Sequence, residues 1–484
     1  MGVTTVNWQG RFAILGWGVS GKASAHALVK RGAQLCAFDG RAQEDDHSDN
    51  DANVKFVSEA DSDALAQAVI DWKPDCIVVS PGIPAHHPIF SAAKNAGVEL
   101  IGEVELAWRL QEDSEHAGRP WLCVTGTNGK TTTVGMLGAM LRAAGENAVE
   151  VGNIGLPICE AIDTDATVFA VELSSFQLHT VSTVSPLASV CLNVDADHLD
   201  WHGSAQAYAA DKAKVYHLTQ KACFYPASDI TVENMVAEAD VIEGARAIGL
   251  TLGIPSISQV GWVEDALVER AFVEKRHMQA QFLAEVDDLR VAYHDGVTDA
   301  ARMDATAAAG LARAFGVSPE AVAEGLRSFT PAHHRRAVIS HAADVTWIDD
   351  SKATNAHAAV ASLSGITPGT AVWIAGGDTK GQEFGDLVTR VAPVLRGVVV
   401  IGKDRSAIVN ALHQRAPQVP FVEVDGHEDW MFSVVNEAVA LSRPGDTVVL
   451  APACASWDQF RSYAQRGDVF RDAVERLEAN WAAQ

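Results

Sequence analysis

Residues 124–133, Val-Thr-Gly-Thr-Asn-Gly-Lys-Thr-Thr-Thr, lie between an apolar run at 121–124 and a small-residue helical pattern at 136–144. A glycine-rich turn between a strand and a helix directs backbone N–H groups at a phosphate, and the helix dipole favours negative charge there. Lys130 can reach the terminal phosphates of a nucleotide, and the Thr131 hydroxyl can ligate Mg²⁺. The stretch therefore predicts a loop that binds a nucleoside triphosphate, although Val124 stands where the commonest phosphate-loop pattern has glycine.

The composition limits the classes of protein to which the chain can belong. Its 484 residues predict about three domains of ~100–200 residues each, and 48% of them are hydrophobic, which suffices for packed cores. The formal net charge of −25 argues against a nucleic-acid or anionic-membrane partner. No apolar run is long enough to span a bilayer. The 7 cysteines show no CxxC pairing, so we expect reduced core thiols in a cytoplasmic protein.

The N-terminal region has the pattern of a Rossmann-like domain. A predicted strand at 12–15 leads into Gly-Trp-Gly-Val-Ser-Gly at 16–21, and a second strand at 34–38 ends at Asp39. Such a turn followed by an acid is typical of NAD-binding proteins, but the same turn binds any diphosphate. A third predicted strand at 75–79 runs into the tight turn Ser80-Pro81-Gly82. A dinucleotide and a nucleotide-sugar are equal candidates on these residues.

Two candidate metal ligands follow predicted strands of the middle region. Glu172 ends an apolar strand at 167–171, and His198 follows a strand at 188–192. Because strands that alternate with helices form a mostly parallel sheet, both side chains are expected at the rim that holds the phosphate loop. A carboxylate in that position is a common Mg²⁺ contact. The alternatives are a helix-capping acid for Glu172 and a capping or core histidine for His198.

The segment 208–216 is helical by composition and carries a lysine. Tyr208, Lys212 and Tyr216 share one face at i, i+4 spacing. The pattern alone predicts that Lys212 is a solvated surface charge. The segment 229–299 that follows contains short strand-like runs but no residues to which we assign chemistry.

The C-terminal region repeats the strand–helix alternation, with strands predicted at 346–348, 371–375, 397–401 and 447–450. Three polar clusters stand directly after strands, at 349–355, 376–381 and 452–460. Since the carboxyl ends of parallel strands meet at one rim, where ligands of α/β proteins bind, the three clusters together predict a ligand site.

Several of these motifs resemble the Mur ligase family of peptidoglycan synthesis. They are the loop 126–132, Glu172-Leu173-Ser174-Ser175-Phe176, Asp197-His198, Asp350-Ser351-Lys352-Ala353-Thr354-Asn355 and Cys454-Ala455-Ser456. The resemblance covers essentially the whole chain in motif order, and the run at 350–355 is similar to the members that add D-glutamate. It implies an α/β fold of three domains. These are a Rossmann-like N-terminal domain (1–102), a central P-loop-type ATPase domain with a mostly parallel sheet (103–331) and a Rossmann-like C-terminal domain (332–484).

The resemblance also implies an activity. We expect a cytoplasmic, monomeric, ATP-dependent ligase that adds D-glutamate to UDP-N-acetylmuramoyl-L-alanine through an acyl phosphate in peptidoglycan precursor synthesis. The implied cofactors are ATP, two Mg²⁺ ions and a carbamylated lysine at Lys212. The alternatives are another Mur-type amide ligase similar to folylpolyglutamate synthase, an NAD-dependent oxidoreductase, and a nucleotide-sensing module that hydrolyses ATP without ligation.

The residue roles implied by the resemblance fall into four sets. The ATP set is Gly126, Thr127, Asn128, Gly129, Lys130, Thr131, Thr132, Asp304, Arg335, Asp350 and Lys352. The metal set is Thr131, Glu172, His198 and Lys212, and the catalytic residues are Lys130, His198 and Lys212. The UDP-substrate set is Gly18, Val19, Ser20, Asp39, Arg41, Ser80, Gly82, Asn153 and His198, which favours a nucleotide-sugar over NAD. The D-glutamate set is Thr354, Lys380, Ser456 and Tyr463.

The sequence departs from the family pattern at three places. Ala300 and Ala301 stand where the family has His-Asn before the adenine-side position Asp304, and Ala337 replaces an acid. Tyr463 replaces the commoner phenylalanine. The first two departures affect the contacts expected for the nucleotide base and leave the phosphate and metal chemistry unchanged.

Overall fold

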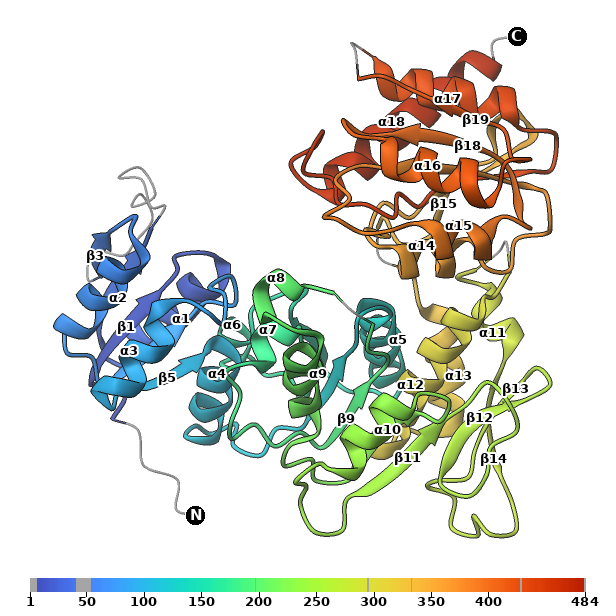
Figure 1. Cartoon of the computed structure of the whole chain (residues 1–484). Coiled ribbons are helices and arrows are strands. Elements are labelled where there is room, and N and C mark those ends of the chain that lie inside the picture. Colours follow the sequence, from blue (N-terminus) through green and yellow to red (C-terminus); the bar gives the residue numbers. More distant parts are fainter. Residues whose placement is uncertain are drawn as a thin grey trace. The chain divides into compact units, whose positions relative to one another are not determined.

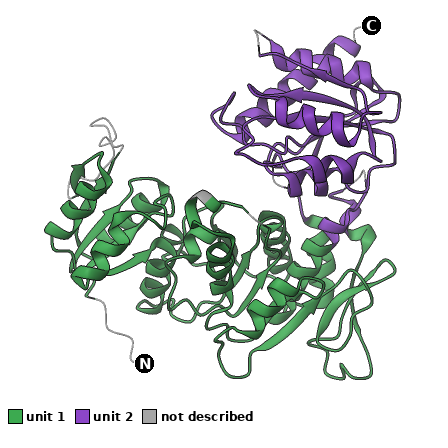
Figure 2. Cartoon of the chain, viewed as in Figure 1, with its two compact units in different colours: residues 1–288, 303–328 green, residues 289–302, 329–484 purple. Residues whose placement is uncertain are grey.

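The computed structural model describes residues 7–40, 54–195, 197–293, 296–331, 333–426 and 429–482. The chain forms two compact units (Figure 2): the first comprises 1–288 and 303–328, and the second comprises 289–302 and 329–484. The first unit contains a five-stranded and a nine-stranded sheet, and the second contains a six-stranded sheet. Arg41, which the sequence assigns to the UDP-substrate set, lies outside the described residues.

The five-stranded sheet is fully parallel and has the order β3-β2-β1-β4-β5. Its strands are β1 (Arg11–Leu15), β2 (Gln34–Asp39), β3 (Lys55–Ser58), β4 (Cys76–Val79) and β5 (Glu99–Gly102), and α1 (Val19–Val29), α2 (Ser62–Asp71) and α3 (Pro88–Ala96) connect them (Figure 1). The direction of strand succession reverses between β1 and β4. In such sheets the crevice at the reversal is the usual ligand site, and here it is bordered by the turns after β1 and β4.

The nine-stranded sheet has the order β14-β13-β12-β11-β10-β9-β6-β8-β7. The parallel strands are β6 (Trp121–Thr125), β7 (Ala148–Gly152), β8 (Val168–Glu172), β9 (Ala188–Cys191), β10 (Ala222–Pro226), β11 (Arg246–Leu250) and β12 (Gln259–Val263), and β13 (Ala266–Glu269) and β14 (Gln281–Glu285) are antiparallel. Its helices are α4 (Glu103–Glu112), α5 (Lys130–Ala143), α6 (Ile158–Ala161), α7 (Ser175–Leu178), α8 (Leu199–His202), α9 (Ala205–Ala213), α10 (Ile230–Ala237), α11 (Val286–Arg290), α12 (Asp299–Phe315) and α13 (Pro319–Ser328). Because β6 lies between β8 and β9, the ends of these three strands share one rim.

The segment 229–299, to which the sequence assigned no chemistry, supplies one edge of this sheet through β11 to β14. The edge is tied to the helical layer by Trp262, which is 1% exposed and donates from Nε1 to Thr306 Oγ1 at 2.9 Å. It therefore extends the core of the first unit.

The six-stranded sheet of the second unit has the order β15-β16-β20-β17-β18-β19, with only β15 antiparallel. Its strands are β15 (Ala337–Ser340), β16 (Thr346–Asp349), β17 (Ala371–Gly376), β18 (Leu395–Ile401), β19 (Phe421–Glu423) and β20 (Thr447–Leu450). The helices are α14 (Ala356–Leu363), α15 (Gly385–Val391), α16 (Ser406–Arg415), α17 (Trp430–Leu441) and α18 (Tyr463–Ala482). Alternating strand residues form separate apolar cores on the two faces, one around Trp373 and one around Trp347, both fully buried. This two-faced burial is typical of parallel sheets covered by helices.

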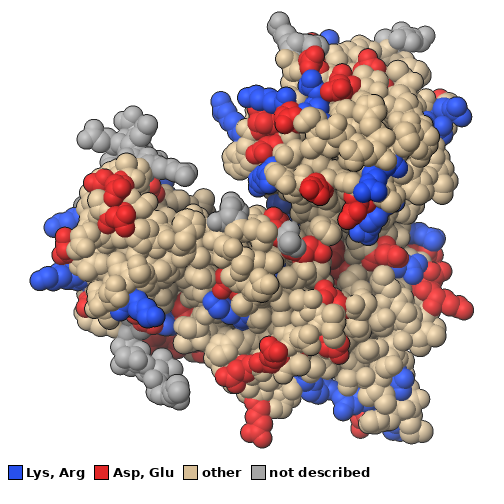
Figure 3. All heavy atoms as spheres, in the orientation of Figure 1, with Lys and Arg blue, Asp and Glu red and all other residues tan. Residues whose placement is uncertain are grey.

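All seven cysteines are buried and free of disulfide bonds, as the sequence predicts for core thiols. Among the described residues, no helix is both long and apolar enough to cross a membrane. On the face shown in Figure 3, Lys and Arg side chains are interspersed with Asp and Glu side chains.

Candidate functional site

The loop at 126–129 joins the fully buried strand β6 to α5. Gly129 has φ +85°, and a Cβ at this position would collide with the carboxylate of Asp304. Asp304 also accepts a hydrogen bond from Thr133 Oγ1 at 3.3 Å, so α12 brings this carboxylate to the first turn of α5. Only glycine satisfies both the backbone conformation and the close approach. The loop thus holds its shape beside a helix N-terminus that can receive a phosphate.

Two lysine amines converge on one carbonyl oxygen of this loop. Lys130 Nζ donates to Gly126 O at 2.6 Å and to Thr127 O at 2.9 Å. Lys212 Nζ, from α9, donates to the same Gly126 O at 2.7 Å. Two lysine amines therefore lie at the phosphate loop, in a chain whose net charge is strongly negative.

The expectation that Lys212 is a solvated charge is wrong. Its side chain is 2% exposed, and its ammonium lies 4.8 Å from the centre of the Tyr208 ring. Burial, with a further contribution from Lys130, lowers the pKa of Lys212 to about 7. The predicted helix is present, but the face that Tyr208 and Lys212 share packs inward against the phosphate loop. The helical pattern carries no signal for that choice of face.

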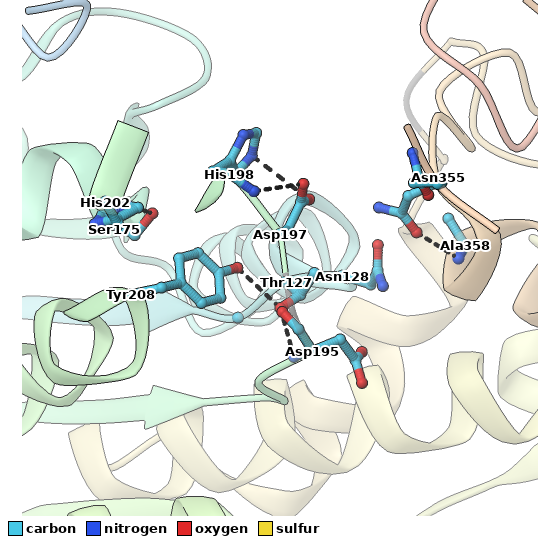
Figure 4. A network of polar contacts seen from close by, with 12 residues as sticks. Thr127, Asn128, Ser175, Asp195, Asp197, His198, His202, Tyr208, Asn355 and Ala358 are labelled. Carbon is cyan, nitrogen blue, oxygen red and sulfur yellow. Dashed lines mark hydrogen bonds and ion pairs between the residues drawn. The ribbon is translucent and has the colours of Figure 1, made fainter. Parts of the chain in front are cut away.

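Tyr208 and Asn193 form hydrogen bonds with residues of the phosphate loop, and the sequence assigned neither of them a role; Figure 4 shows Tyr208 beside Thr127. The Tyr208 hydroxyl lies 2.9 Å from Thr127 Oγ1, and Thr127 Oγ1 in turn accepts from the N–H of Asp195 at 3.0 Å. Asn193 Oδ1 accepts from the N–H of Asn128 at 2.9 Å, and Asn193 Nδ2 donates to Asn128 O at 3.2 Å. Asn193 comes shortly after strand β9, so its position at the rim was the available signal.

Glu172 is the last residue of β8 and is 1% exposed. It accepts hydrogen bonds from Thr131 Oγ1 at 2.6 Å and from Asn153 Nδ2 at 2.8 Å. The alternative of a helix-capping acid is wrong, because Ser174 caps α7 by accepting from the Gln177 N–H. The structure thus brings a metal-set carboxylate, the hydroxyl of the phosphate-loop helix and a substrate-set amide into direct contact.

His198 lies in the left-handed region with φ +52°, at the start of α8. Its N–H donates to Asp197 Oδ1 at 2.8 Å, and its Nε2 lies 3.5 Å from Asp197 Oδ2 (Figure 4). Its ring packs edge-on against Phe176, 4.8 Å away between ring centres, and 40% of its side chain is exposed. His198 is therefore an accessible rim side chain rather than a core histidine.

The donor atoms at this rim fit a magnesium ion better than a zinc ion. Among the described residues, no three His, Cys, Asp or Glu side chains form a group that could hold a metal ion, as an all-protein zinc site does. The buried Glu172 carboxylate has hydrogen bonds from two neutral groups, the Thr131 hydroxyl and the Asn153 amide. A few carboxylate and hydroxyl oxygens, completed by water and substrate phosphates, are what Mg²⁺ prefers.

Hydrogen bonds between side chains and the backbone hold the turns at the crevice of the five-stranded sheet. Asp39 Oδ2 accepts from the Trp17 N–H at 2.6 Å, and Ser80 Oγ donates to Gly16 O at 2.8 Å. A pocket beside Ser80 is also lined by helices that follow strands of the nine-stranded sheet, through Gln177 of α7 and Trp201 of α8. The turns at 16–21 and 80–82 therefore lie together at one crevice, and Val19 is 73% exposed there.

The three polar clusters of the second unit meet at one rim. Ala453 N–H donates to Ala353 O at 2.9 Å, which joins the first cluster to the third. Asp378 and Ala455 exchange two backbone hydrogen bonds of 2.9 Å, which join the second to the third. Thr354, Lys380 and Ser456 belong to these loops, and Ser456 is 3% exposed whereas Lys380 is exposed.

Tyr463 contacts a residue of the ATP set. Lys352 Nζ donates to the Tyr463 hydroxyl at 2.9 Å and lies 4.2 Å from the centre of its ring. A phenylalanine, commoner in the family pattern, would retain the ring contact and lose the hydrogen bond. Asp350 follows β16 on the same loop and donates its N–H to Leu450 O at 2.9 Å, and Arg335 precedes β15.

Comparisons with known proteins match Mur ligases over nearly the whole chain. Family models match at 10–102 (Mur ligase MurD-like, N-terminal domain), 124–247 (Mur ligase middle domain) and 334–454 (Mur ligase, glutamate ligase domain). UDP-N-acetylmuramoylalanine--D-glutamate ligase of Streptomyces coelicolor is 48% identical over 473 residues, covering 96% of this chain and 98% of the relative. The enzyme of that name from Streptomyces avermitilis is 46% identical, covering 98% of this chain and 100% of the relative.

A solved structure agrees with the fold. The MurF ligase of Thermotoga maritima in complex with ADP has a TM-score of 0.57 at 15% identity, covering 98% of this chain and 100% of that chain. The three matched domains and the mostly parallel sheets confirm the three-domain α/β fold that the sequence predicts.

Proposed function

Because the chain belongs to the Mur ligase family, we propose that it is the ATP-dependent ligase that adds D-glutamate to UDP-N-acetylmuramoyl-L-alanine. The observation that carries this proposal is that the match to D-glutamate ligases spans nearly the whole of both chains. The reaction belongs to peptidoglycan precursor synthesis in the cytoplasm. The comparisons do not favour a folylpolyglutamate synthase or an oxidoreductase. That the protein acts as a monomer stays a prediction.

The chemistry proceeds in two steps. The terminal carboxylate of the L-alanyl group attacks the γ-phosphorus of ATP, which forms an acyl phosphate and releases ADP. The neutral amine of D-glutamate then attacks the acyl carbon, and the tetrahedral intermediate loses a proton from nitrogen and expels inorganic phosphate, which leaves the new amide. Phosphoryl transfer depends on in-line positioning and on neutralising the charge of the phosphoryl oxygens.

Lys130 supplies one of these charges. Its amine crosses the phosphate loop to Gly126 O and Thr127 O, within reach of a phosphate held by the loop N–H groups. The contacts of Tyr208 and Asn193 to Thr127 and Asn128 fix the loop before ATP arrives. A loop fixed in advance loses little conformational entropy when it binds, and its donors are already oriented toward the phosphoryl group.

The rim around Glu172 is where Mg²⁺ would bind. Thr131, Glu172, His198 and a carbamate on Lys212 would hold the ions, which supply charge neutralisation for the transferring phosphoryl group when bound. The contact between Glu172 and Thr131 supports this assignment, since it places an anionic and a neutral oxygen at the start of the phosphate-loop helix.

Lys212 is suited to carbamylation. The reaction joins the neutral amine nitrogen to the carbon of CO₂ and releases one proton, so it needs a lysine that is unprotonated near neutral pH. Burial and the neighbouring Lys130 lower the pKa of Lys212 to about 7, which supports this requirement. The product carries anionic oxygens, which are suitable Mg²⁺ ligands.

The remaining substrates are assigned to the crevice of the five-stranded sheet and to the loops at the rim of the six-stranded sheet. We assign the UDP group to Gly18, Val19, Ser20, Asp39, Ser80 and Gly82, with Asn153 and His198 toward the muramoyl group. The reversal of strand order beside the turns at 16–21 and 80–82 supports this assignment. We assign D-glutamate to Thr354, Lys380, Ser456 and Tyr463, which the backbone pairs between the three loops support.

Release of phosphate from ATP tests the proposal. We expect release that requires both UDP-N-acetylmuramoyl-L-alanine and D-glutamate, with little release when either is omitted. Equal release without the amino acid would indicate a nucleotide-hydrolysing module and would contradict the ligase assignment.

A further inference from the structure

Arg466 is among the largest fully buried side chains of the described residues, with 1% of its surface exposed. It lies on α18, three residues after Tyr463. Burial lowers its pKa to about 10, so the guanidinium remains charged near neutral pH. Because burying a charge is costly unless its donors are satisfied, the partners of Arg466 must be held firmly in place.

Those partners are neutral groups on two of the three rim loops. Arg466 Nε donates to Ser351 Oγ at 2.9 Å, and Nη2 donates to Ser351 O at 2.8 Å. Nη1 donates to Cys454 O at 3.1 Å. Ser351 Oγ donates onward to Tyr463 O at 2.8 Å, which ties the loop after β16 to the start of α18. The planar guanidinium fixes the directions of these bonds relative to one another.

The third rim loop packs against the same guanidinium. Gly377 has φ +136°, and a Cβ there would lie 3.3 Å from Arg466 Nη1 and 3.2 Å from Cys454 Cβ. The next residue, Asp378, exchanges two backbone hydrogen bonds of 2.9 Å with Ala455. A Cβ at Gly377 would collide with Ala455 O, so the absence of a side chain there is what lets this loop pair with the loop that contains Cys454, beside the guanidinium of Arg466.

We propose that Arg466 is a positioning residue that sets the three loops of the amino-acid site relative to one another and thereby controls the affinity for D-glutamate. The inference rests on the proposed function. Thr354, Ser456 and Lys380 each lie two or three residues after Ser351, Cys454 and Gly377, the positions that Arg466 contacts or approaches. Arg466 is itself buried, so it acts through these loops and not by contact with the substrate.

Replacing Arg466 by lysine distinguishes a role in positioning the loops from a role of the positive charge alone. Arg466→Lys keeps a cation but replaces a rigid fork by a single ammonium on a flexible stem, which cannot donate in three fixed directions. If the fork positions the loops, Arg466→Lys behaves like Arg466→Met. If only the positive charge matters, Arg466→Lys behaves like the wild type.

The test measures the KM of each substrate in variants of the full-length enzyme. We expect Arg466→Lys and Arg466→Met to raise the KM for D-glutamate roughly ten- to hundredfold, as displaced binding groups do. The KM for UDP-N-acetylmuramoyl-L-alanine should stay within about twofold, because its proposed turns lie in the first unit. Arg476→Lys is the matched control on the same helix. Arg476 is half exposed and pairs with Asp429 at 2.8 Å, so its replacement should leave all KM values unchanged.

A milder variant keeps the test decisive if the Arg466 variants fold poorly. Ser351→Ala removes the Oγ that accepts from Arg466 Nε and donates to Tyr463 O, and we expect it to raise the KM for D-glutamate severalfold. In the Arg466→Lys background the same replacement should raise this KM by a smaller factor than in the wild type, because the bond between Arg466 Nε and the Oγ is already lost. Fully additive effects would contradict the shared role.

Three results would overturn the inference. They are an unchanged KM for D-glutamate in Arg466→Lys, an equal rise in the KM for the UDP-substrate, and an effect in Arg466→Met alone. The proposed function fails in a different way, when the wild type releases no phosphate with D-glutamate. Lys380→Met, which removes a proposed substrate contact directly, should raise the KM for D-glutamate whether or not Arg466 positions the loops.

Discussion

Lys130 and Lys212 place two amines on the oxygen of Gly126, and this pair explains much of the chemistry proposed for the phosphate loop. Two ammonium groups so close repel each other, and Lys212 is also fully buried. Both effects favour the neutral form of Lys212. A carbamate there would reverse the interaction, because it would set an anion beside the Lys130 cation.

The phosphate-loop lysine gives the first prediction. Lys130→Ala removes a charge that neutralises the transferring phosphoryl group, so we expect turnover to fall on the order of 10³-fold or more. Binding of the UDP-substrate should persist, as measured by calorimetry, because its proposed turns belong to the five-stranded sheet. Turnover within tenfold of the wild type would mean that this loop is not the ATP site.

Replacing Lys212 gives the second prediction. Lys212→Ala should be nearly inactive, and short-chain carboxylates should restore part of the activity by supplying the missing oxygens. Turnover with and without added acetate is the measurement. Lys275→Ala, at an exposed position, is the control and should behave as the wild type in both conditions. Lys214 is a poor control because it pairs with Asp211 at 2.8 Å.

Two results would count against the carbamate. The first is full activity of Lys212→Ala. The second is a wild-type enzyme that retains full turnover although its intact mass shows no added CO₂.

Among the elements, the ends of β6, β8 and β9 were predictable from the sequence, but the sheet edge formed by β11 to β14 was not. The runs that became β6, β8 and β9 are short, apolar and followed by polar residues, so their shared rim was predictable from the βα alternation, whereas their order in the sheet was not predicted. The strands β11 to β14 alternate weakly, and their pairing is set by contacts such as that of Trp262 with Thr306. Such long-range contacts leave no local pattern, as the inward face of α9 also shows.

Glu103 begins α4 and gives a prediction for pH. It is 3% exposed and accepts from the Cys159 N–H at 2.7 Å. Burial raises its pKa from 4.5 to about 7. The folded state therefore binds this proton more tightly than the unfolded state does, and the associated stability, complete below pH 4.5, is lost as the pH rises through about 7.

Glu103→Gln removes this titration and keeps an acceptor for Cys159. The unfolding free energy of the variant minus that of the wild type should therefore rise between about pH 5 and pH 8, by on the order of 3 kcal/mol. Urea unfolding at the two pH values measures it. A difference that stays constant or falls with pH would contradict a buried, proton-binding Glu103.

At the scale of the whole molecule, we propose that the domain boundaries lie at 102/103 and 331/332. The first follows the end of β5 and precedes α4, and the second precedes β15. The alternation of strands and helices was enough to predict three α/β sheets. The sequence could not supply the residues that hold the loops together, such as Asn193 and Arg466, because their roles depend on contacts between distant segments.

We propose that the second unit binds D-glutamate and that ATP drives its attachment to the UDP-linked substrate. Mass spectrometry of the UDP-linked product, formed with ATP and either D- or L-glutamate, tests it most directly. We expect one added glutamyl group with D-glutamate, matched by one phosphate released. We expect almost none with L-glutamate, because loops that fix both carboxylates turn the amine of the L-enantiomer away from the acyl carbon. Equal incorporation of both enantiomers, or phosphate release without a glutamyl product, would contradict it.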